Sequence, residues 1–199
     1  MIVTIHQPEH FPYMGFFQKI KAADLFIVLD NVKFNKQYFQ NRNKILTKEG
    51  KEEWITVQVE KSAPNKNINE VKTKWDQKWK RRLLEKIKRN LDFDASEFYS
   101  HEKLIDINMA SIRWAFEELD IKIPMIYASN LNATGAKSEL LANLIRNAIE
   151  DTNVTYLSGP SGRDYLDMKY FDNIDVKYFS PKVVNYYSSL YNICNGGMI

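Results

Sequence analysis

The sequence predicts an α/β protein with an open, largely parallel sheet. Short apolar runs rich in β-branched residues alternate with helical patterns near both ends of the chain, which is the arrangement of βαβ units. Two further strand patterns lie between these ends and are joined by a turn-like segment. We therefore expect a sheet with flanking helices that carries an inserted β-hairpin and a helical segment.

The N-terminal part reads as strand, helix and strand. Residues 2–5 are predicted to form the first strand. The segment that contains Pro8 ends this strand, because proline cannot donate a ladder hydrogen bond. Apolar side chains recur at helical spacing over residues 12–23, and residues 25–29 form a second buried strand. A parallel βαβ unit is the expected result.

The middle and the C-terminal third supply the remaining elements. A hairpin is predicted from strands at 39–45 and 53–59, followed by a loop at 63–67. Helices are predicted at 76–90, 96–100, 104–119 and 137–149, a helical turn at 162–167, and strands at 124–127, 154–157 and 176–179. We expect one domain over residues 1–199, with 63–120 as a helical insertion or cap.

Composition narrows the class of protein. The chain has 199 residues, 44% of them hydrophobic, and a net charge of only +3. A single cysteine, Cys194, excludes an internal disulfide, and no apolar run approaches the ~20 residues of a membrane span, so we expect a cytoplasmic protein.

The basic runs at 78–82 and 86–89 are interpreted as the solvated face of a helix, so no nucleic-acid partner is expected. Trp75, Trp79 and Trp114 are interpreted as core or cap packing.

The strongest motif is His6-Gln7-Pro8 with Gly15 and Lys19. His6 stands at a strand end, where ligands bind in open α/β sheets, and an imidazole there suits general acid–base catalysis. A histidine whose ring nitrogens bond to the backbone of a tight turn fits the same residues equally well.

His6 and His10 are four residues apart, which raises two further alternatives. A metal pair needs one helical face and a third ligand, but Pro8 interrupts the helix and no third ligand follows, so no metal site is predicted. The second alternative is the paired-histidine turn of nucleotidylyltransferases, although the expected His-x-Gly-His is absent.

Two polar clusters follow along the chain. Asp30-Asn31 ends the second strand, where a carboxylate could orient the imidazole or bind a sugar hydroxyl, or could form an Asx turn or cap. Asn41-Arg42-Asn43 lies in a strand pattern, so it forms either an exposed edge or a polar site. Arg42 suits a two-pronged contact with a phosphate, and Lys33 and Lys36 add positive charge.

A small-residue loop, Ser158-Gly159-Pro160-Ser161-Gly162, follows a late strand. Its glycines permit backbone N–H groups to point at a phosphate, although an ordinary βα turn uses the same residues. A serine hydrolase is excluded because the Gly-x-Ser-x-Gly spacing is missing. Lys137 and Ser138 are similar to the end of a P-loop but lack its glycine spacing, and they are interpreted as a helix start.

These motifs together resemble the N-terminal signature of the WbqC-like family: His6-Gln7-Pro8, residues 12–17 with Lys19, Ala23-Asp24, Asp30 and residues 41–43. Tyr156 to Gly159 with Tyr165 and Leu166 is similar to the family's second block. Tyr13 stands where the family usually has tryptophan, and the C-terminal segment is abbreviated.

The resemblance implies a place among genes for O-antigen and capsule sugars. It implies a transferase that moves an acyl or aminoacyl group, such as glycyl, onto a nucleotide-linked amino sugar, with His6 as base oriented by Asp30. No cofactor follows from the sequence. A nucleotidylyltransferase-like enzyme and a non-catalytic binding or assembly protein are the alternatives. The expected substrate-binding residues are Gln7, Tyr13, Gly15, Lys19, Asn31, Lys33, Asn41, Arg42, Asn43, Lys137, Ser158, Gly159, Ser161, Gly162 and Tyr165.

Overall fold

The structure is a computed structural model that describes residues 1–36, 38–76, 78–150 and 153–199. The chain divides into two compact units, each built from three segments. The first, called the sheet unit here, comprises Met1–Gln7, Gln18–Asp30 and Lys122–Lys182. The second, called the hairpin unit, comprises Pro8–Phe17, Asn31–Ile121 and Val183–Ile199.

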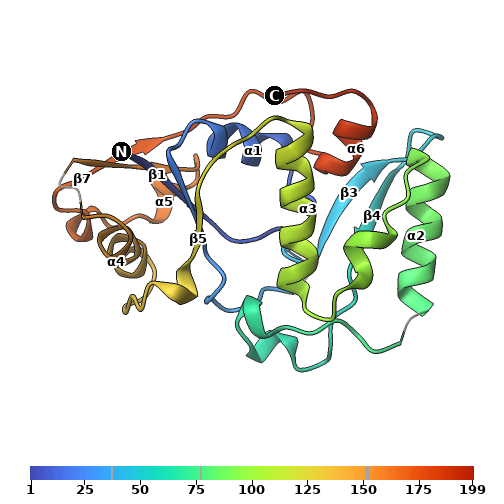
Figure 1. Cartoon of the computed structure of the whole chain (residues 1–199), viewed down its shortest axis with the longest axis horizontal. Coiled ribbons are helices and arrows are strands. Elements are labelled where there is room, and N and C mark those ends of the chain that lie inside the picture. Colours follow the sequence, from blue (N-terminus) through green and yellow to red (C-terminus); the bar gives the residue numbers. More distant parts are fainter. Residues whose placement is uncertain (37, 77, 151–152) are drawn as a thin grey trace. The chain divides into compact units, whose positions relative to one another are not determined.

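The sheet unit contains five parallel strands (Figure 1). They are β1 (Ile2–His6), β2 (Leu25–Val28), β5 (Met125–Tyr127), β6 (Val154–Ser158) and β7 (Ile174–Tyr178), in the spatial order β5-β2-β1-β6-β7. The predicted α/β fold with a parallel sheet is confirmed. Val3 and residues 26–28 are completely buried, as expected for central parallel strands that are covered on both faces.

The strand order contains a topological switch point. From β1 the chain proceeds to β2 and later to β5 on one side, whereas β6 and β7 occupy the other side. If the five strands are numbered 1 to 5 along the chain, their spatial order is 3-2-1-4-5. Successive strands are added on one side of β1 up to β5 and on its other side from β6 onwards, so the switch point lies between β1 and β6. In open α/β sheets such a switch point opens a crevice outside the carboxyl ends of the two strands.

Helices connect these strands. α1 (Met14–Lys21) lies between β1 and β2 in the sequence, α4 (Ser138–Ala148) precedes β6, and the single turn of α5 (Gly162–Tyr165) follows it. Two 3₁₀ turns, η4 (Ala128–Asn130) and η5 (Met168–Tyr170), complete the sheet unit. The predicted helix at 12–23 begins only at Met14, because Tyr13 instead forms an isolated bridge with Ser188.

The hairpin unit holds an antiparallel pair, β3 (Arg42–Leu46) and β4 (Glu52–Thr56), which confirms the predicted hairpin. The pair lies alongside α2 (Lys78–Leu91) (Figure 1). The other elements are α3 (Leu104–Glu118), α6 (Ser189–Cys194) and the 3₁₀ turns η1 (Ala63–Asn65), η2 (Ile68–Glu70) and η3 (Ser96–Ser100). Gln77, part of the predicted helix at 76–90, lies outside the described residues.

α2 is amphipathic, and most of its basic residues face solvent as predicted, whereas Lys86 donates to the carbonyl oxygen of Trp54 and pairs with Glu53. Trp79, Leu83 and Ile87 are buried on one face, while Arg81 and Arg82 are exposed. The interpretation of Trp75 as core or cap packing is wrong, since its side chain is 87% exposed. No helix among the residues described is long and apolar enough to cross a membrane.

Candidate functional site

Polar side chains follow the carboxyl ends of four neighbouring strands of the sheet unit. His6 is the last residue of β1, and Ser158 is the last residue of β6. Asp30 follows β2, and Ser129 follows β5. Because the carboxyl ends of parallel strands meet at one edge, these side chains lie along the same edge of the sheet, and His6 and Ser158 flank the switch point.

His6 is a partly exposed, neutral imidazole. Its Nδ1 lies 3.0 Å from the carbonyl oxygen of Gln7. A carbonyl oxygen can only accept, so Nδ1 carries the hydrogen and the lone pair is on Nε2. The protein atoms packed around this partly buried ring keep water from it and, together with the positive charge of Lys19, lower the pKa of His6 to about 3. The imidazole is therefore unprotonated at neutral pH, which is the form that a general base requires.

Lys19 places a positive charge at this edge. Its side chain is only 4% exposed, and Nζ donates to the carbonyl oxygen of Ile5, 3.3 Å away. The residue stands in the last turn of α1, the end at which the helix dipole favours a cation.

Replacing Lys19 by methionine is expected to raise the pKa of His6 above its value of about 3, because one of the two causes that lower it is removed. Methionine is unbranched and lacks only the terminal ammonium position, so it fills most of the space of the buried side chain. Histidine chemical shifts followed through a pH titration measure the effect. Lys21→Met removes the same charge from an exposed position of the same helix and should leave the pKa unchanged, and an equal response of both variants contradicts this role of Lys19.

Asp30 fixes the turn that follows β5. Its carboxylate is almost completely buried, with Oδ1 accepting from the backbone N–H of Ser129 at 2.9 Å and Oδ2 accepting from the Ser129 hydroxyl at 2.7 Å. The two residues are 99 positions apart, so no local motif marks Ser129, and sequence reasoning missed it. The carboxylate thereby holds the ends of β2 and β5 in a fixed geometry.

The loop at 158–162 is held by close packing. Gly162 donates to the carbonyl oxygen of Gly159 at 3.0 Å, so this N–H is already used within the turn. The buried Ser158 hydroxyl lies against Gly162, where an added Cβ would be only 2.2 Å from Oγ. Glycine is thus required at 162 by the hydroxyl of Ser158.

We expect Gly162→Ala to destabilise the protein by about 1–3 kcal/mol, the usual cost of overpacking a buried site. Ser158→Gly in the same chain should restore most of this loss, because it removes the atom that clashes. Gly159→Ala is the matched control, since a Cβ there meets nothing within 4 Å. Urea unfolding of the single and double variants measures the coupling, and additive losses in the double variant contradict the packing explanation.

Ser138 connects the start of α4 to the segment after α5. Its hydroxyl accepts from the backbone N–H of Asp167 at 2.9 Å and donates to the carbonyl oxygen of Tyr165 at 3.5 Å. The interpretation of Lys137 and Ser138 as a helix start is confirmed, because α4 begins at Ser138. Lys137 is exposed and has a φ of 52°, a conformation that non-glycine residues rarely adopt.

The polar cluster at 41–43 is part of the hairpin unit and is mostly structural. Asn41 donates to the carbonyl oxygen of Val57 at 3.0 Å, and Asn43 donates to that of Phe11 at 2.8 Å. Both amides are buried. The Arg42 guanidinium lies 4.1 Å from the centre of the Trp54 ring, and its buried Nε has no hydrogen-bond partner among the described residues.

His10 is also structural. The side chain is 0% exposed, and its Nε2 forms a hydrogen bond with the Tyr99 hydroxyl, 3.1 Å away. Burial lowers the pKa of His10 to about 3. Within the part of the chain that the structure describes, no three His, Cys, Asp or Glu side chains form a group that could hold a metal ion.

The burial of His10 predicts an acid-sensitive fold. The unfolded residue titrates near pH 6.5 and the folded one near 3, so its contribution is fully present above pH 6.5 and is lost as the pH falls from 6.5 towards 3. The slope is about 1.4 kcal/mol per pH unit. Urea titrations at about pH 7.5 and about pH 5 test this. His10→Gln should be less stable than the wild type at the higher pH but lose less on acidification, and an unchanged pH dependence contradicts the assignment.

The two units divide the expected site residues between them. Those in the sheet unit are His6, Gln7, Lys19, Asp30, Lys137, Ser158, Gly159, Ser161, Gly162 and Tyr165. Those in the hairpin unit are Tyr13, Gly15, Asn31, Lys33, Asn41, Arg42 and Asn43. In the hairpin unit Tyr13 packs against Tyr186 with ring centres 5.6 Å apart, Gly15 is buried in α1, and Lys33 is exposed.

The fold and this edge define an α/β protein with polar groups gathered at the carboxyl ends of its central strands. The chain belongs to the WbqC-like protein family, whose profile matches residues 7–193. It is similar to the uncharacterized protein Rv1507c of Mycobacterium tuberculosis, with 28% identity over 194 residues that cover 86% of this chain and 78% of that protein. No solved structure gives a significant match.

Proposed function

We propose that this protein is a transferase of bacterial surface-polysaccharide biosynthesis that moves an acyl or aminoacyl group, such as glycyl, onto a nucleotide-linked amino sugar. One observation carries the proposal: a neutral imidazole and a small-residue loop flank the switch point of a parallel sheet. The polysaccharide context is supported by the family resemblance, and the single cysteine is the reason to propose a cytoplasmic reaction.

The proposed chemistry is attack of the amino nitrogen of the sugar on the carbonyl carbon of an acyl donor. As the C–N bond forms, the nitrogen becomes acidic and its proton passes to Nε2 of His6. The carbonyl oxygen becomes an oxyanion, which then collapses and expels the leaving group of the donor. Asp30 acts as a positioning residue through its hold on Ser129.

A pKa of about 3 makes His6 a weak base in the free protein. The buried ammonium of Lys19 is one cause, so an anionic group bound beside it would offset its charge and raise the pKa of His6. A nucleotide diphosphate is such a group. The substrate would therefore strengthen the base that acts on it.

Two other reactive groups are disfavoured. The paired-histidine turn of a nucleotidylyltransferase needs an accessible second histidine, whereas His10 is completely buried. Burial raises the pKa of Cys194 to about 11, so a thiolate nucleophile is scarce at neutral pH. The ligand roles of Arg42 and the other residues of the hairpin unit stay predictions.

Mass spectrometry of reaction mixtures tests the proposal. The protein is incubated with a panel of nucleotide-linked amino sugars and with acyl or glycyl thioesters, and the expected product is the N-acylated or N-glycylated nucleotide sugar. Binding of these sugars without transfer from any donor would overturn the proposal in favour of a binding protein. Magnesium-dependent release of pyrophosphate from a nucleoside triphosphate and a sugar phosphate would overturn it in favour of nucleotidylyl transfer.

A further inference from the structure

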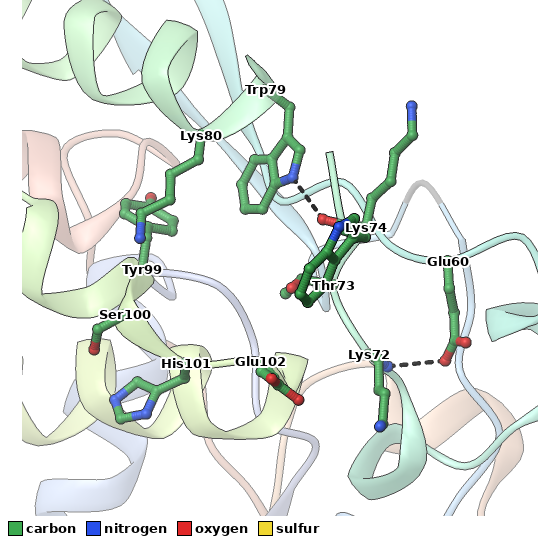
Figure 2. Close-up of a pocket in the computed structure, with 11 residues that line it drawn as sticks. Glu60, Lys72, Thr73, Lys74, Trp79, Lys80, Tyr99, Ser100, His101 and Glu102 are labelled. Atoms are coloured by element: carbon green, nitrogen blue, oxygen red, sulfur yellow. Dashed lines mark hydrogen bonds between the residues drawn. The ribbon is translucent and has the colours of Figure 1, made fainter. Parts of the chain in front are cut away.

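The hairpin unit contains a pocket of about 510 Å³ (Figure 2). None of the catalytic or substrate-binding residues expected from the sequence lines this pocket. One wall is the extended segment at 72–75, another is the start of α2 with Trp79 and Lys80, and the third is the segment at 99–102. In Figure 2, Lys80 extends from α2 on the side of Tyr99 and Ser100, across from Thr73.

The walls are fixed by backbone hydrogen bonds. Thr73 donates to the carbonyl oxygen of Glu102 and Lys74 to that of Gln58, both at 2.7 Å, so the extended segment pairs on both sides. The Trp79 indole N–H donates to the carbonyl oxygen of Lys74 at 3.1 Å. The pocket is therefore preformed, and a ligand would bind without ordering these segments first.

The pocket carries an excess of positive charge. Lys72, Lys74 and Lys80 line it, and none of the three forms an ion pair with any residue that the structure describes. Two acids also line the pocket, and Glu102 offsets one of the three lysine charges. The other, Glu60, is already paired with Lys66 at 2.7 Å and accepts from the backbone N–H of Lys72 at 3.0 Å. These contacts lower the pKa of Glu60 to about 2, so it remains ionised and its charge is offset by Lys66.

Trp75 adds a large aromatic surface to the same wall. Its side chain is 87% exposed, whereas Trp79 next to it is only 7% exposed. Exposure of an indole to water is unfavourable, and it gains stability when a flat ring covers it. An exposed indole beside unpaired ammonium groups is suited to a ligand that combines a ring with an anionic group.

We propose that this pocket binds a nucleoside phosphate, with the base stacked on Trp75 and the phosphates held by Lys80 and Lys72. The hydroxyl of Thr73 lines the pocket for contact with the ribose. That of Ser100 already donates to the carbonyl oxygen of Glu97 at 2.8 Å, so it can only accept from a ribose hydroxyl. The volume lies within the range of about 300–1,000 Å³ that small-molecule pockets occupy, which favours a single nucleotide over a nucleic-acid strand. The proposal is independent of the transferase function, because it uses other residues.

Calorimetric titration with UDP tests the pocket, with uridine and pyrophosphate as the two halves of the ligand. UDP should bind saturably with a Kd below about 1 mM, and each half should bind at least about tenfold more weakly, because it keeps only the stacking or only the charge contacts. Trp75→Ala should weaken UDP binding about tenfold or more, and Lys80→Gln about fivefold. Both side chains are outside the core, so these variants should keep the fold.

Two matched controls and one reporter complete the experiment. Tyr186→Ala removes an exposed aromatic ring elsewhere in the hairpin unit, and Lys88→Gln removes a charge from the solvent face of α2, so neither should change UDP binding. His101 lines the pocket, and its NMR signals should shift when UDP is added. The proposal is overturned if pyrophosphate binds as tightly as UDP, if Trp75→Ala has no effect, if UDP shifts only His6, or if poly(U) binds and UDP does not.

Discussion

Replacing His6 by alanine is expected to lower the rate of acyl transfer by about 10²–10⁴-fold, the usual contribution of a positioned general base. The residue lies at the carboxyl end of β1 and is only partly buried, so the fold should survive the change. The rate is measured by mass spectrometry under saturating nucleotide sugar, and binding of that sugar is measured on the same variant.

A base role and a structural role of His6 predict different results. If His6 accepts the proton, the alanine variant keeps its affinity for the nucleotide sugar, and added imidazole restores part of the rate. Loss of affinity and rate together, with no rescue by imidazole, would instead assign His6 to ligand positioning. An unchanged rate would remove His6 from the mechanism.

The largest loss of stability is expected for Asn108→Ala in α3. This side chain is 0% exposed, and its amide donates both to the carbonyl oxygen of Pro8 at 2.9 Å and to that of Gln40 at 2.7 Å. Alanine leaves two buried carbonyl groups without this donor and creates a cavity, which should cost about 3–5 kcal/mol. The melting temperature should fall by about 10 °C.

Asn143→Ala is the matched control for Asn108. Asn143 also donates from its amide to a carbonyl oxygen, that of Thr134 at 2.9 Å, but its hydrogen bond is exposed to water. Water replaces the lost donor there, so the melting temperature should change little. Similar losses in the two variants would show that the buried amide of Asn108 has no special role in holding the segments around Pro8 and Gln40.

The sheet could be predicted from the sequence because its strands are local patterns. Apart from Thr4, residues 2–5 and 25–29 are apolar, as expected for strands covered on both faces, and they match β1 and β2 closely. The hairpin could likewise be predicted, because a turn-like segment joins its two strand patterns. The strand order, and with it the switch point beside His6, depends on pairing between distant segments, which no local pattern records.

The candidate site was predictable only in part for the same reason. His6 and Asp30 could be located because His6 ends one recognisable strand and Asp30 closely follows another. Ser129 could not be linked to Asp30, since only tertiary structure brings residues 99 positions apart into contact. Asn41 and Asn43 have the residue types of a binding site, yet their amides bond to buried backbone, and sequence cannot distinguish these uses.

The burial of Trp75 could not be predicted from its residue type alone. Tryptophan is usually well buried, so packing was the expected role, and Trp79 fulfils it. Trp75 differs because residues 72–74 run as an extended segment whose backbone is fixed on both sides. Its indole is therefore left exposed to solvent, where it lines the pocket of the hairpin unit.

The histidine NMR signals report on the proposed substrate site separately from the rest of the protein, because the chain has three histidines in three different settings. His6 stands at the sheet edge, His10 is buried, and His101 is in the pocket of the hairpin unit. Addition of a nucleotide-linked amino sugar should shift the His6 signals to saturation and raise the pKa of His6, with His10 unaffected. His6 signals that stay unchanged at saturating ligand would contradict a substrate site at the carboxyl ends of β1 and β6.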